Sequence, residues 1–293
     1  MKRFLIIAIM LLGVIALFQG CRRSGGSSAG TGIQVKGSDT MVNLGQAWAE
    51  EYMKKNPDAN VSVTGGGSGT GIAALINGNA DIIQSSREMT SEELDAARKR
   101  GMDPQEFEVA RDGLSVIVNP ANSVNRLTIA QLSDIYTRKI TNWRQLGGRG
   151  TEIVVLSRDK SSGTHVFFLE HVLRRGNAKG PEEFANTVLM LPSSQAIADE
   201  VASNSDAIGY VGMGYVQAER HKTVNVAKDA NSTYVEPTPA NVLNNTYPIA
   251  RPLYVYTTNK PAGAVKAFID FVLSDEGQKI VQQQEFVPIR TIK

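Results

Sequence analysis

The stretch VSVTGGGSGTGIAAL, residues 61–75, passes from alternating residues through a run of glycines to an apolar segment. Val alternates with Ser and Thr over 61–64, which predicts a strand, and the apolar residues beyond the glycines predict a short helix over 70–77. A glycine-rich loop before a helix presents backbone amides to an anion, and the helix dipole favours negative charge there. The stretch predicts a strand–loop–helix unit of an α/β fold whose loop is a candidate phosphate site.

Strand-like and helix-like segments alternate along the rest of the chain. Residues 90–93, Thr-Ser-Glu-Glu, have capping-box spacing and predict a helix start. Predicted strands lie at 34–36, 81–84, 114–118, 153–156, 207–211 and 253–257. Predicted helices lie at 41–55, 90–99, 129–136 and 165–174, with one or two more over 262–283. This alternation indicates α/β layers with a mostly parallel sheet.

Two predicted strands, 114–118 and 253–257, are markedly apolar and enclose a long segment with strands and helices of its own. The simplest arrangement is a discontinuous first lobe, 33–118 plus 248–293, with a second lobe, 119–247, inserted into it. Two lobes joined by two crossing segments form a hinge around a cleft.

The N-terminal end has the features of an export signal. Basic residues precede an unbroken apolar run at 4–18, which is shorter than the ~20 residues of a spanning helix. Residues 1–20 are therefore interpreted as a signal peptide. The chain's one cysteine, Cys21, follows directly, and this placement resembles bacterial lipoprotein precursors, whose first mature residue is a lipid-modified cysteine. Residues 21–32 are rich in Gly and Ser and predict a flexible tether from a lipid anchor.

The composition is that of an ordinary globular protein, with 42% hydrophobic and 20% charged residues. The signal peptide holds one Lys, one Arg and no acid, so its removal from a chain of net charge +2 leaves no net charge. Nothing here predicts a nucleic-acid surface. An anion site must therefore rest on local charge.

Three short segments share one design, in which a strand end is followed by glycine and hydroxyl residues and then by a helix start. They are 37–41, 65–71 and 158–164, and the third begins with Arg158. Unpaired amides at helix starts and nearby hydroxyls suit an anion. Three such segments, one led by an arginine, predict an anion site.

Two larger phosphate ligands fit the sequence poorly. Residues 69–74 match the dinucleotide pattern Gly-x-Gly-x-x-Ala, but Asp81 begins the next strand, whereas a ribose-binding acid should end it. A triphosphate loop requires Lys after its last glycine, and Ile72 stands there.

Catalytic and metal sites are also weakly indicated. His165 lies beside Thr164, so a Ser/His hydrolase stays open, although the chain has no Gly-x-Ser-x-Gly elbow. His165 and His171 are six residues apart, which is not the spacing of a helical metal pair. We expect no cofactor, no metal and no enzymatic activity.

Seven segments, taken in order, resemble the phosphate-binding components of bacterial phosphate ABC transporters. They are GSDTM at 37–41, GGGSGTG at 65–71, DIIQSSR at 81–87, ITNWRQLGG at 140–148, Arg158 with SGT at 162–164, AIGYVG at 207–212, and DEGQ at 275–278 with VP at 287–288. The resemblance implies a type II periplasmic-binding-protein fold with two mixed sheets flanked by helices. In this family two α/β lobes close over one inorganic phosphate, which then passes to a membrane permease.

The resemblance also assigns phosphate-binding roles to individual residues. Thr40 is expected to bind through its hydroxyl and Met41 through its backbone amide, with Ser38 assisting. Arg158 is expected to pair its planar guanidinium with two phosphate oxygens. The remaining expected contacts are Ser68, Ser86, Ser162, Gly163 and Thr164.

One position departs from the family pattern. Members that discriminate phosphate from sulfate carry an aspartate where this chain has Ser86, followed by Arg87. Asp39 is the nearest replacement as acceptor of the phosphate proton, or else a helix cap. Arg87 is interpreted as a salt-bridge partner between the lobes or a second phosphate contact, and Asp159 as a group that orients Arg158 or faces solvent.

The sequence thus predicts an exported, lipid-anchored, monomeric phosphate-binding protein that serves an ABC permease. Three alternatives stay open. The same fold could bind sulfate, arsenate or another tetrahedral oxyanion, because Ser86 replaces the acid. The chain could be an exported serine hydrolase or phosphatase that uses Ser162 or Ser68, or a tethered sensor or adhesin without a transport role.

Overall fold

The computed structural model describes residues 32–292, so the predicted signal peptide, Cys21 and nearly all of the tether lie outside the described residues. A first five-stranded sheet is formed by β1 (Ile33–Gly37), β2 (Val61–Thr64), β3 (Ile82–Ser85), β4 (Gln105–Gly113) and β12 (Ala250–Thr257). Its order is β2-β1-β3-β12-β4. The first three strands run parallel, and β12 runs antiparallel to both of its neighbours.

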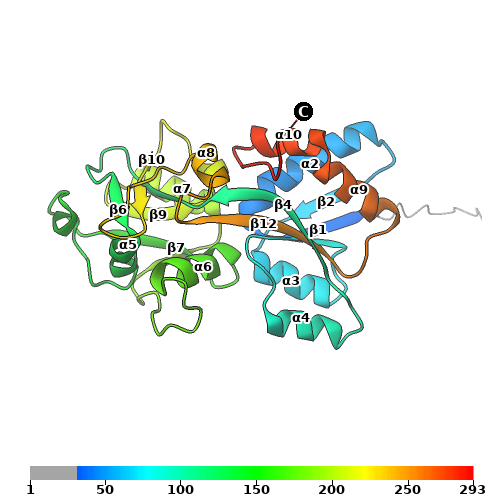
Figure 1. The fold of residues 1–293 in the computed structure, drawn as a ribbon, viewed down its shortest axis with the longest axis horizontal. Coiled ribbons are helices and arrows are strands. Elements are labelled where there is room, and N and C mark those ends of the chain that lie inside the picture. The colour runs from blue at the N-terminus through cyan, green and yellow to red at the C-terminus, as the bar shows by residue number, and fades with distance from the viewer. Residues whose placement is uncertain (1–31, 293) are drawn as a thin grey trace, which may run out of the picture. The chain divides into compact units, whose positions relative to one another are not determined.

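Helices cover both faces of this sheet. They are the 3-10 helix η1 (Asp39–Met41), α2 (Val42–Lys55), α3 (Ser68–Ile76), α4 (Ser91–Arg98), α9 (Gly263–Leu273) and α10 (Asp275–Gln283). Figure 1 shows α2, α9 and α10 on one face and α3 and α4 on the other. The apolar stripe of α2 is buried, and Trp48 Nε1 donates to the Gly277 carbonyl at 2.8 Å. The C-terminal helices are thereby attached to the N-terminal part of the sheet.

A second five-stranded sheet has the order β10-β5-β9-β7-β8. Its strands are β5 (Ser115–Val118), β7 (Val154–Arg158), β8 (Leu189–Leu191), β9 (Ala207–Val211) and β10 (Lys222–Thr223), and β6 (Arg126–Thr128) pairs separately with β11 (Asn225–Ala227). The accompanying helices are α5 (Ile129–Tyr136), η2 (Trp143–Leu146), α6 (Gly163–Phe168), the π-helix η3 (Leu169–Leu173), α7 (Ser194–Ser203), η4 (Met213–Tyr215) and α8 (Pro239–Leu243).

Strand β9 shows why helices lie on both faces of the second sheet, since side chains alternate between the faces of a strand. Tyr210 stacks on Phe168 of α6, with ring centroids 3.9 Å apart. Ala207 and Val211 belong instead to the apolar cluster around Ile197 of α7. Every residue of β9 is buried, so the strand needs apolar partners on both sides.

Strands β4 and β12 connect the two sheets. They pair antiparallel along their whole length, from Gly113 opposite Ala250 to Gln105 opposite Thr257, with a bulge after Leu253. Figure 1 shows them running side by side between the two halves of the fold. Only Leu114 separates β4 from β5.

The expected lobe boundary after residue 118 requires a correction. Strand β5 pairs with β9 and β10 of the second sheet, so residues 115–118 belong there rather than to the first lobe. The crossing occurs at residues 113–115, because the apolar run at 114–118 supplies a fully buried strand of the second sheet.

The predicted α/β class and the two mixed sheets implied by the resemblance are confirmed, whereas the mostly parallel sheet indicated by the alternation alone is wrong. Both sheets are mixed, because β12 enters the first sheet and β5 enters the second in antiparallel orientation. Strand β4, which no alternation predicted, forms the first crossing. The helix predicted at 165–174 is shared between α6 and a π-helical turn. Within residues 32–292, no helix is both long and apolar enough to span a bilayer.

Candidate functional site

Three loops that the sequence singled out meet in the structure. Thr40 Oγ1, after β1, lies 2.7 Å from Thr164 Oγ1, after β7. The Gly69 amide in the glycine-rich loop donates to the Ser161 carbonyl at 2.9 Å. Ser161 Oγ in turn donates to the Gly66 carbonyl at 3.0 Å. Loops of the first sheet thus contact a loop of the second sheet directly.

A buried group of hydroxyls lies at this meeting point. Ser68 Oγ accepts from the Ser86 amide at 3.0 Å and lies 3.3 Å from Ser86 Oγ, which in turn lies 3.5 Å from Thr164 Oγ1. All of these hydroxyls, with that of Thr40, are at most 1% exposed. We call Thr40, Ser68, Ser86 and Thr164 the hydroxyl cluster. Hydroxyls both donate and accept, so the cluster can satisfy the oxygens of a tetrahedral oxyanion.

Glycines allow this close approach of the loops. A Cβ added at Gly163 would lie 2.3 Å from Ser68 Oγ and 2.7 Å from Ser86 Oγ. Gly37 has φ +133°, a region that side chains disfavour, and a Cβ there would lie 2.2 Å from the Gln84 carbonyl oxygen. The glycines therefore bring the backbone against the cluster.

Helix α6 presents its first amides at the cluster. Ser162 caps the helix by accepting from the His165 amide at 3.4 Å. The helix begins at Gly163, so the amides of Gly163 and Thr164 have no acceptor within the helix. Both residues are buried, which places two donors and the positive end of the helix dipole among the hydroxyls.

Arg158, at the end of β7, is only 1% exposed. Its Nη1 donates to Ser194 Oγ at 2.9 Å and lies 3.1 Å from Asp39 Oδ2, and its Nη2 donates to the Pro192 carbonyl at 2.9 Å. Its Nε is buried and has no hydrogen-bond partner among residues 32–292. A buried guanidinium with an unused donor is suited to an anionic acceptor.

Asp39 was expected to accept the phosphate proton or to cap a helix, and its contacts in the structure differ from both. Its Oδ2 accepts from the Ser194 amide at 2.7 Å as well as pairing with Arg158, and its side chain makes no helix cap. Tyr215 donates to the Asp39 carbonyl at 2.8 Å. Asp39 therefore joins the two sheets and fixes Arg158, so Oδ2 is already engaged.

Three further expectations about site residues are corrected. The Arg87 guanidinium donates to both Glu93 oxygens at 2.7 Å, so it forms a salt bridge within one lobe rather than between lobes. Asp159 accepts from the Ser161 amide at 2.8 Å, and within the described residues its side chain forms no hydrogen bond or ion pair with the Arg158 guanidinium. The Met41 amide donates to the Ser38 carbonyl at 3.1 Å, because the 3-10 turn uses it. Ser38 itself is buried beside this turn.

Sequence reasoning missed two charged residues at the centre of the site, Arg251 on β12 and Asp112 on β4. Arg251 Nη2 donates to Thr164 Oγ1 at 3.0 Å, and Nη1 donates to the Ser86 carbonyl at 3.1 Å. Asp112 Oδ2 accepts from Arg251 Nε at 3.1 Å and from Nη2 at 2.9 Å. An arginine two residues before the apolar run LYVYT was a usable signal, but its partners are distant in sequence.

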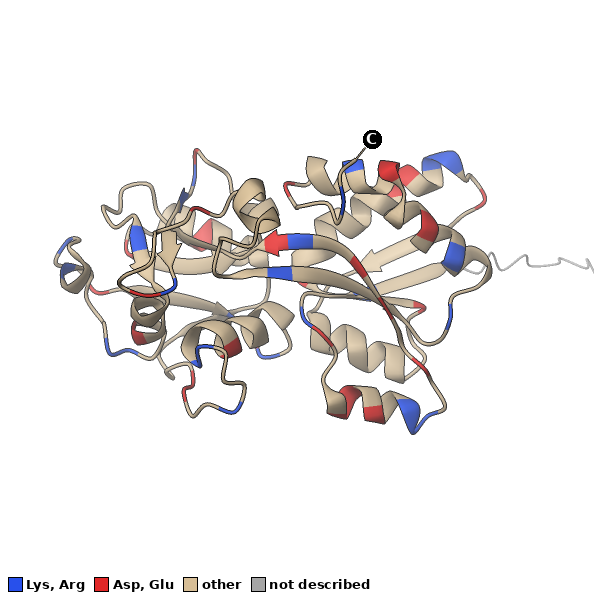
Figure 2. Cartoon of the chain, in the orientation of Figure 1, with Lys and Arg blue, Asp and Glu red and all other residues tan. Residues whose placement is uncertain are grey.

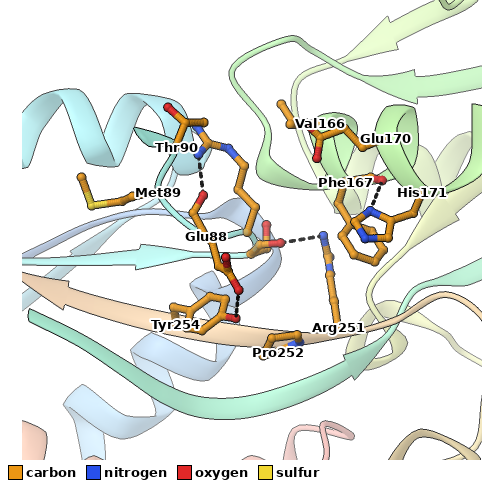
Figure 3. A pocket seen from close by; sticks show the side chains of 12 residues that line it. Glu88, Met89, Thr90, Val166, Phe167, Glu170, His171, Arg251, Pro252 and Tyr254 are labelled. Atoms are coloured by element: carbon orange, nitrogen blue, oxygen red, sulfur yellow. Dashed lines mark hydrogen bonds between the residues drawn. The ribbon is translucent and has the colours of Figure 1, made fainter. Parts of the chain in front are cut away.

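A pocket of about 340 Å³ opens beside the hydroxyl cluster, and Ser86 and Arg251 form part of its wall. Figure 3 shows Arg251 between Phe167 and His171 on one side and Glu88 and Tyr254 on the other. The Arg251 guanidinium lies 5.3 Å from the centroid of the Phe167 ring, within cation–π range. Arg251 thus contacts the hydroxyl cluster and also borders the pocket.

The histidine beside the site is not arranged for nucleophilic catalysis by Ser162. The His165 ring lies 3.3 Å, through Nδ1, from Ser157 Oγ and stacks on Phe184, whereas Ser162 contacts only the His165 backbone amide. Burial lowers the pKa of His165 from its ordinary value of 6.5. The ring therefore belongs to the apolar layer behind α6.

Charged residues of both signs are interspersed over the elements in Figure 2, in agreement with the balanced composition. The charged side chains at the site form two ion pairs. The buried Arg158 pairs with the partly buried Asp39, and Arg251 pairs with Asp112, both of which are buried. Among the described residues, no group of three or more His, Cys, Asp or Glu is positioned to hold a metal ion. The buried arginines, the hydroxyl cluster and the first amides of α6 are local donors suited to an anion.

Comparison with known proteins gives a consistent family assignment. A family model described as the PBP superfamily domain matches residues 23–276. The phosphate-binding protein PstS of Pseudomonas aeruginosa is 34% identical over 86% of this chain and 81% of its own length. That of Bacillus subtilis is 31% identical over 92% of this chain and 84% of its own length.

Solved structures show the same fold. A Clostridium perfringens protein described as a phosphate ABC transporter substrate-binding protein, solved with bound phosphate, has a TM-score of 0.79 and 35% identity, covering 88% of this chain and all of its own. An ABC-type phosphate transport receptor from Vibrio cholerae has a TM-score of 0.68 and 32% identity, covering 87% and 99%. These similarities confirm the expected two-lobed type II periplasmic-binding-protein fold.

Proposed function

The chain belongs to the PBP superfamily and, within it, to the family of the PstS phosphate-binding proteins, and on that premise we propose that it binds inorganic phosphate and delivers it to an ABC-type import permease. The matched relatives are named for phosphate binding or phosphate transport. The site described above supplies the donors that this ligand requires.

The observation that carries the proposal is the buried Arg158 beside the hydroxyl cluster. Its Nε has no partner among residues 32–292, and it pairs with Asp39, the neighbour of Thr40. A guanidinium donates to two oxygens of a tetrahedral anion in fixed geometry, and hydroxyls and amides complete the shell. Its proposed partners in binding phosphate are Thr40, Ser68, Ser86, Ser162, Gly163 and Thr164, with Ser38 in the adjoining turn.

The proposed mechanism is capture by hinge closure, without covalent chemistry. We propose a first lobe of about residues 33–113 plus 248–293 and a second lobe between them, with β4 and β12 as the hinge. Contacts to one ligand from both lobes select the closed arrangement, because the ligand stabilises the state in which both sets of donors are present. Thr40 and Thr164, on different lobes, already lie 2.7 Å apart.

The remaining parts of the proposal concern the cell. We propose that residues 1–20 are removed on export, that Cys21 carries a lipid anchor, and that the protein acts as a monomer and turns over no substrate. Mass spectrometry of the protein from its own cells tests the anchor. A Cys21→Ala variant should lose the lipid mass and appear in the soluble fraction.

The first test is calorimetric titration of the purified, ligand-stripped protein with phosphate and then sulfate, at pH 6 and pH 8. Phosphate binding without turnover of a generic phosphoester supports the proposed function. Comparable binding of sulfate would indicate a binding protein for tetrahedral oxyanions in general. This alternative is open because Ser86 replaces the family aspartate. No heat with phosphate, or release of phosphate from the ester, would contradict the proposal.

A further inference from the structure

Arg251 occupies a position that no loop residue of the site shares. It lies on β12, one of the two crossing strands, and donates both to the Ser86 carbonyl after β3 and to Thr164 Oγ1 in α6. Its guanidinium therefore contacts both lobes. The side chain is only 1% exposed, yet it also borders the pocket of Figure 3.

Asp112 holds Arg251 in this position. Its Oδ2 accepts from two nitrogens of Arg251, and its Oδ1 accepts from the Met213 amide at 3.0 Å. The side chains of the pair are 1% and 0% exposed. Burial of an ion pair costs desolvation free energy that an apolar pair would not, so the pair is a poor source of stability alone.

One N–H group of the Arg251 guanidinium has no acceptor among the described residues. Four of its five N–H groups have acceptors: two on Asp112, one on Thr164 and one on Ser86. The fifth, on Nη1, has none among residues 32–292. Both oxygens of Asp112 are engaged, so the pair presents a donor and no free acceptor to a ligand.

The two buried arginines of the site act on each other. Burial is the main cause that lowers the pKa of Arg251 from its ordinary value, Asp112 opposes this, and the charge of Arg158 lowers the pKa further. Arg158 comes from β7 of the second lobe and Arg251 from the crossing strand. An anion between them relieves their repulsion, and a doubly charged anion relieves it more.

From this geometry we propose that Arg251 is a second anion-binding guanidinium of the site, positioned by Asp112, and that it makes the site prefer the dianion of phosphate to the monoanion. The inference rests on the proposed phosphate-binding function. Arg251, a residue of the crossing strand β12, would then take part in phosphate recognition as well as in the fold.

The test compares Arg251→Gln and Arg251→Lys with the unaltered protein by phosphate titration calorimetry at pH 6, 7 and 8. At pH 8, where the dianion dominates, Arg251→Gln should weaken binding on the order of 30-fold, as expected for loss of one partner of a buried charge contact. Arg251→Lys keeps the charge and the ion pair with Asp112 but loses the fork, and should weaken binding about tenfold.

The pH dependence separates this role from a structural one. For the unaltered protein, affinity should rise from pH 6 to pH 8 with the dianion fraction, and in Arg251→Gln this rise should be smaller. Other charged or titratable groups surround Arg251, and all of them are common to every variant: Asp112, Arg158, Tyr210, Arg87, Glu88, Glu170, His171 and Tyr254. The matched control is Arg111→Gln, because Arg111 lies on β4 next to Asp112 but pairs at 2.8 Å with the half-exposed Glu108.

Arg111→Gln should leave both affinity and pH dependence unchanged. Should Arg251→Gln fail to fold, Arg251→Lys decides, because its charge is retained. A folded Arg251→Lys protein with unaltered phosphate affinity would overturn the inference, as would an equal loss at pH 6 and pH 8 in folded Arg251→Gln. Absence of phosphate binding by the unaltered protein would instead overturn the proposed function.

Discussion

Arg158 illustrates how single residues make this site. Its guanidinium is fixed by Ser194 Oγ, the Pro192 carbonyl and Asp39, and these contacts leave Nε without a partner among residues 32–292. The two terminal nitrogens therefore hold the side chain in place, and Nε is the donor that remains for a ligand. Such a side chain is preorganised, and little conformational entropy is lost when the anion binds.

Replacement of Arg158 by Gln should weaken phosphate binding on the order of 30-fold or more, because a buried charge-assisted contact is lost. Calorimetry measures the change. Lys160→Gln is the matched control, since Lys160 has the same charge in the same loop but is exposed. Equal losses in both variants would show that the loop acts through its general field rather than through a direct contact.

Gly163→Ala tests the close approach of the two lobes. The added Cβ would lie 2.3 Å from Ser68 Oγ, and overpacking of this kind costs about 1–3 kcal/mol. We expect the Kd for phosphate to rise about tenfold, because the closed arrangement is the one that carries the clash.

The control for this variant is Gly150→Ala, whose Cβ would meet only the end of the flexible Arg144 side chain at an exposed position. Its affinity should equal that of the unaltered protein. Unchanged binding by Gly163→Ala would mean that the ligand is held with the lobes farther apart.

At the scale of elements, helix α6 combines a polar start with an apolar rear. Thr164 belongs to the hydroxyl cluster and Gly163 lies against it, while Phe168, four residues after Thr164, is buried and stacks on Tyr210. The helix then changes to a π-helical turn at Leu169–Leu173. Such turns are frequent at functional sites, and this one follows the helix that bears the site.

His165 in α6 should make stability depend on pH. Burial lowers its pKa below 6.5, so the unfolded chain binds this proton more readily than the folded chain. The unfolding free energy should be at its full value above pH 6.5 and fall as the pH drops below it. Denaturant titrations between pH 5 and pH 7 measure this slope.

In His165→Gln, the unfolding free energy should change less between pH 5 and pH 7 than in the unaltered protein, whatever the absolute stability of the variant. His171→Gln serves as the control, because His171 lies two turns further along the same helical segment and is exposed. An unchanged slope in His165→Gln would assign the pH dependence to other groups.

For the whole molecule, a ligand held by both lobes should stabilise the folded chain. A ligand that binds only the folded state, at a concentration of 100 times its Kd, adds about 2.7 kcal/mol to the unfolding free energy. Thermal unfolding with and without phosphate measures this, and the rise in Tm should be lost in Arg158→Gln. A Tm independent of phosphate in a protein that binds it calorimetrically would contradict capture by both lobes.

Much of this molecule follows from the sequence alone. Strands such as 61–64 and 207–211 and the helix at 129–136 were predicted at their observed bounds, because local periodicity and caps determine them. The three glycine–hydroxyl loops were recognised as one site for the same reason. Each loop carries its donors in a short local pattern, so the donor types could be read without the fold.

Other features were decided only by the tertiary structure. Strand β4, with its charged sequence QEFEVARDG, becomes a strand because it pairs along the whole of β12. Asp39 received Ser194 as a partner only through the fold, because the two residues are 155 positions apart. The ion pair of Asp112 and Arg251 joins residues that are 139 positions apart, and only the pairing of two crossing strands brings those charges together under the hydroxyl cluster.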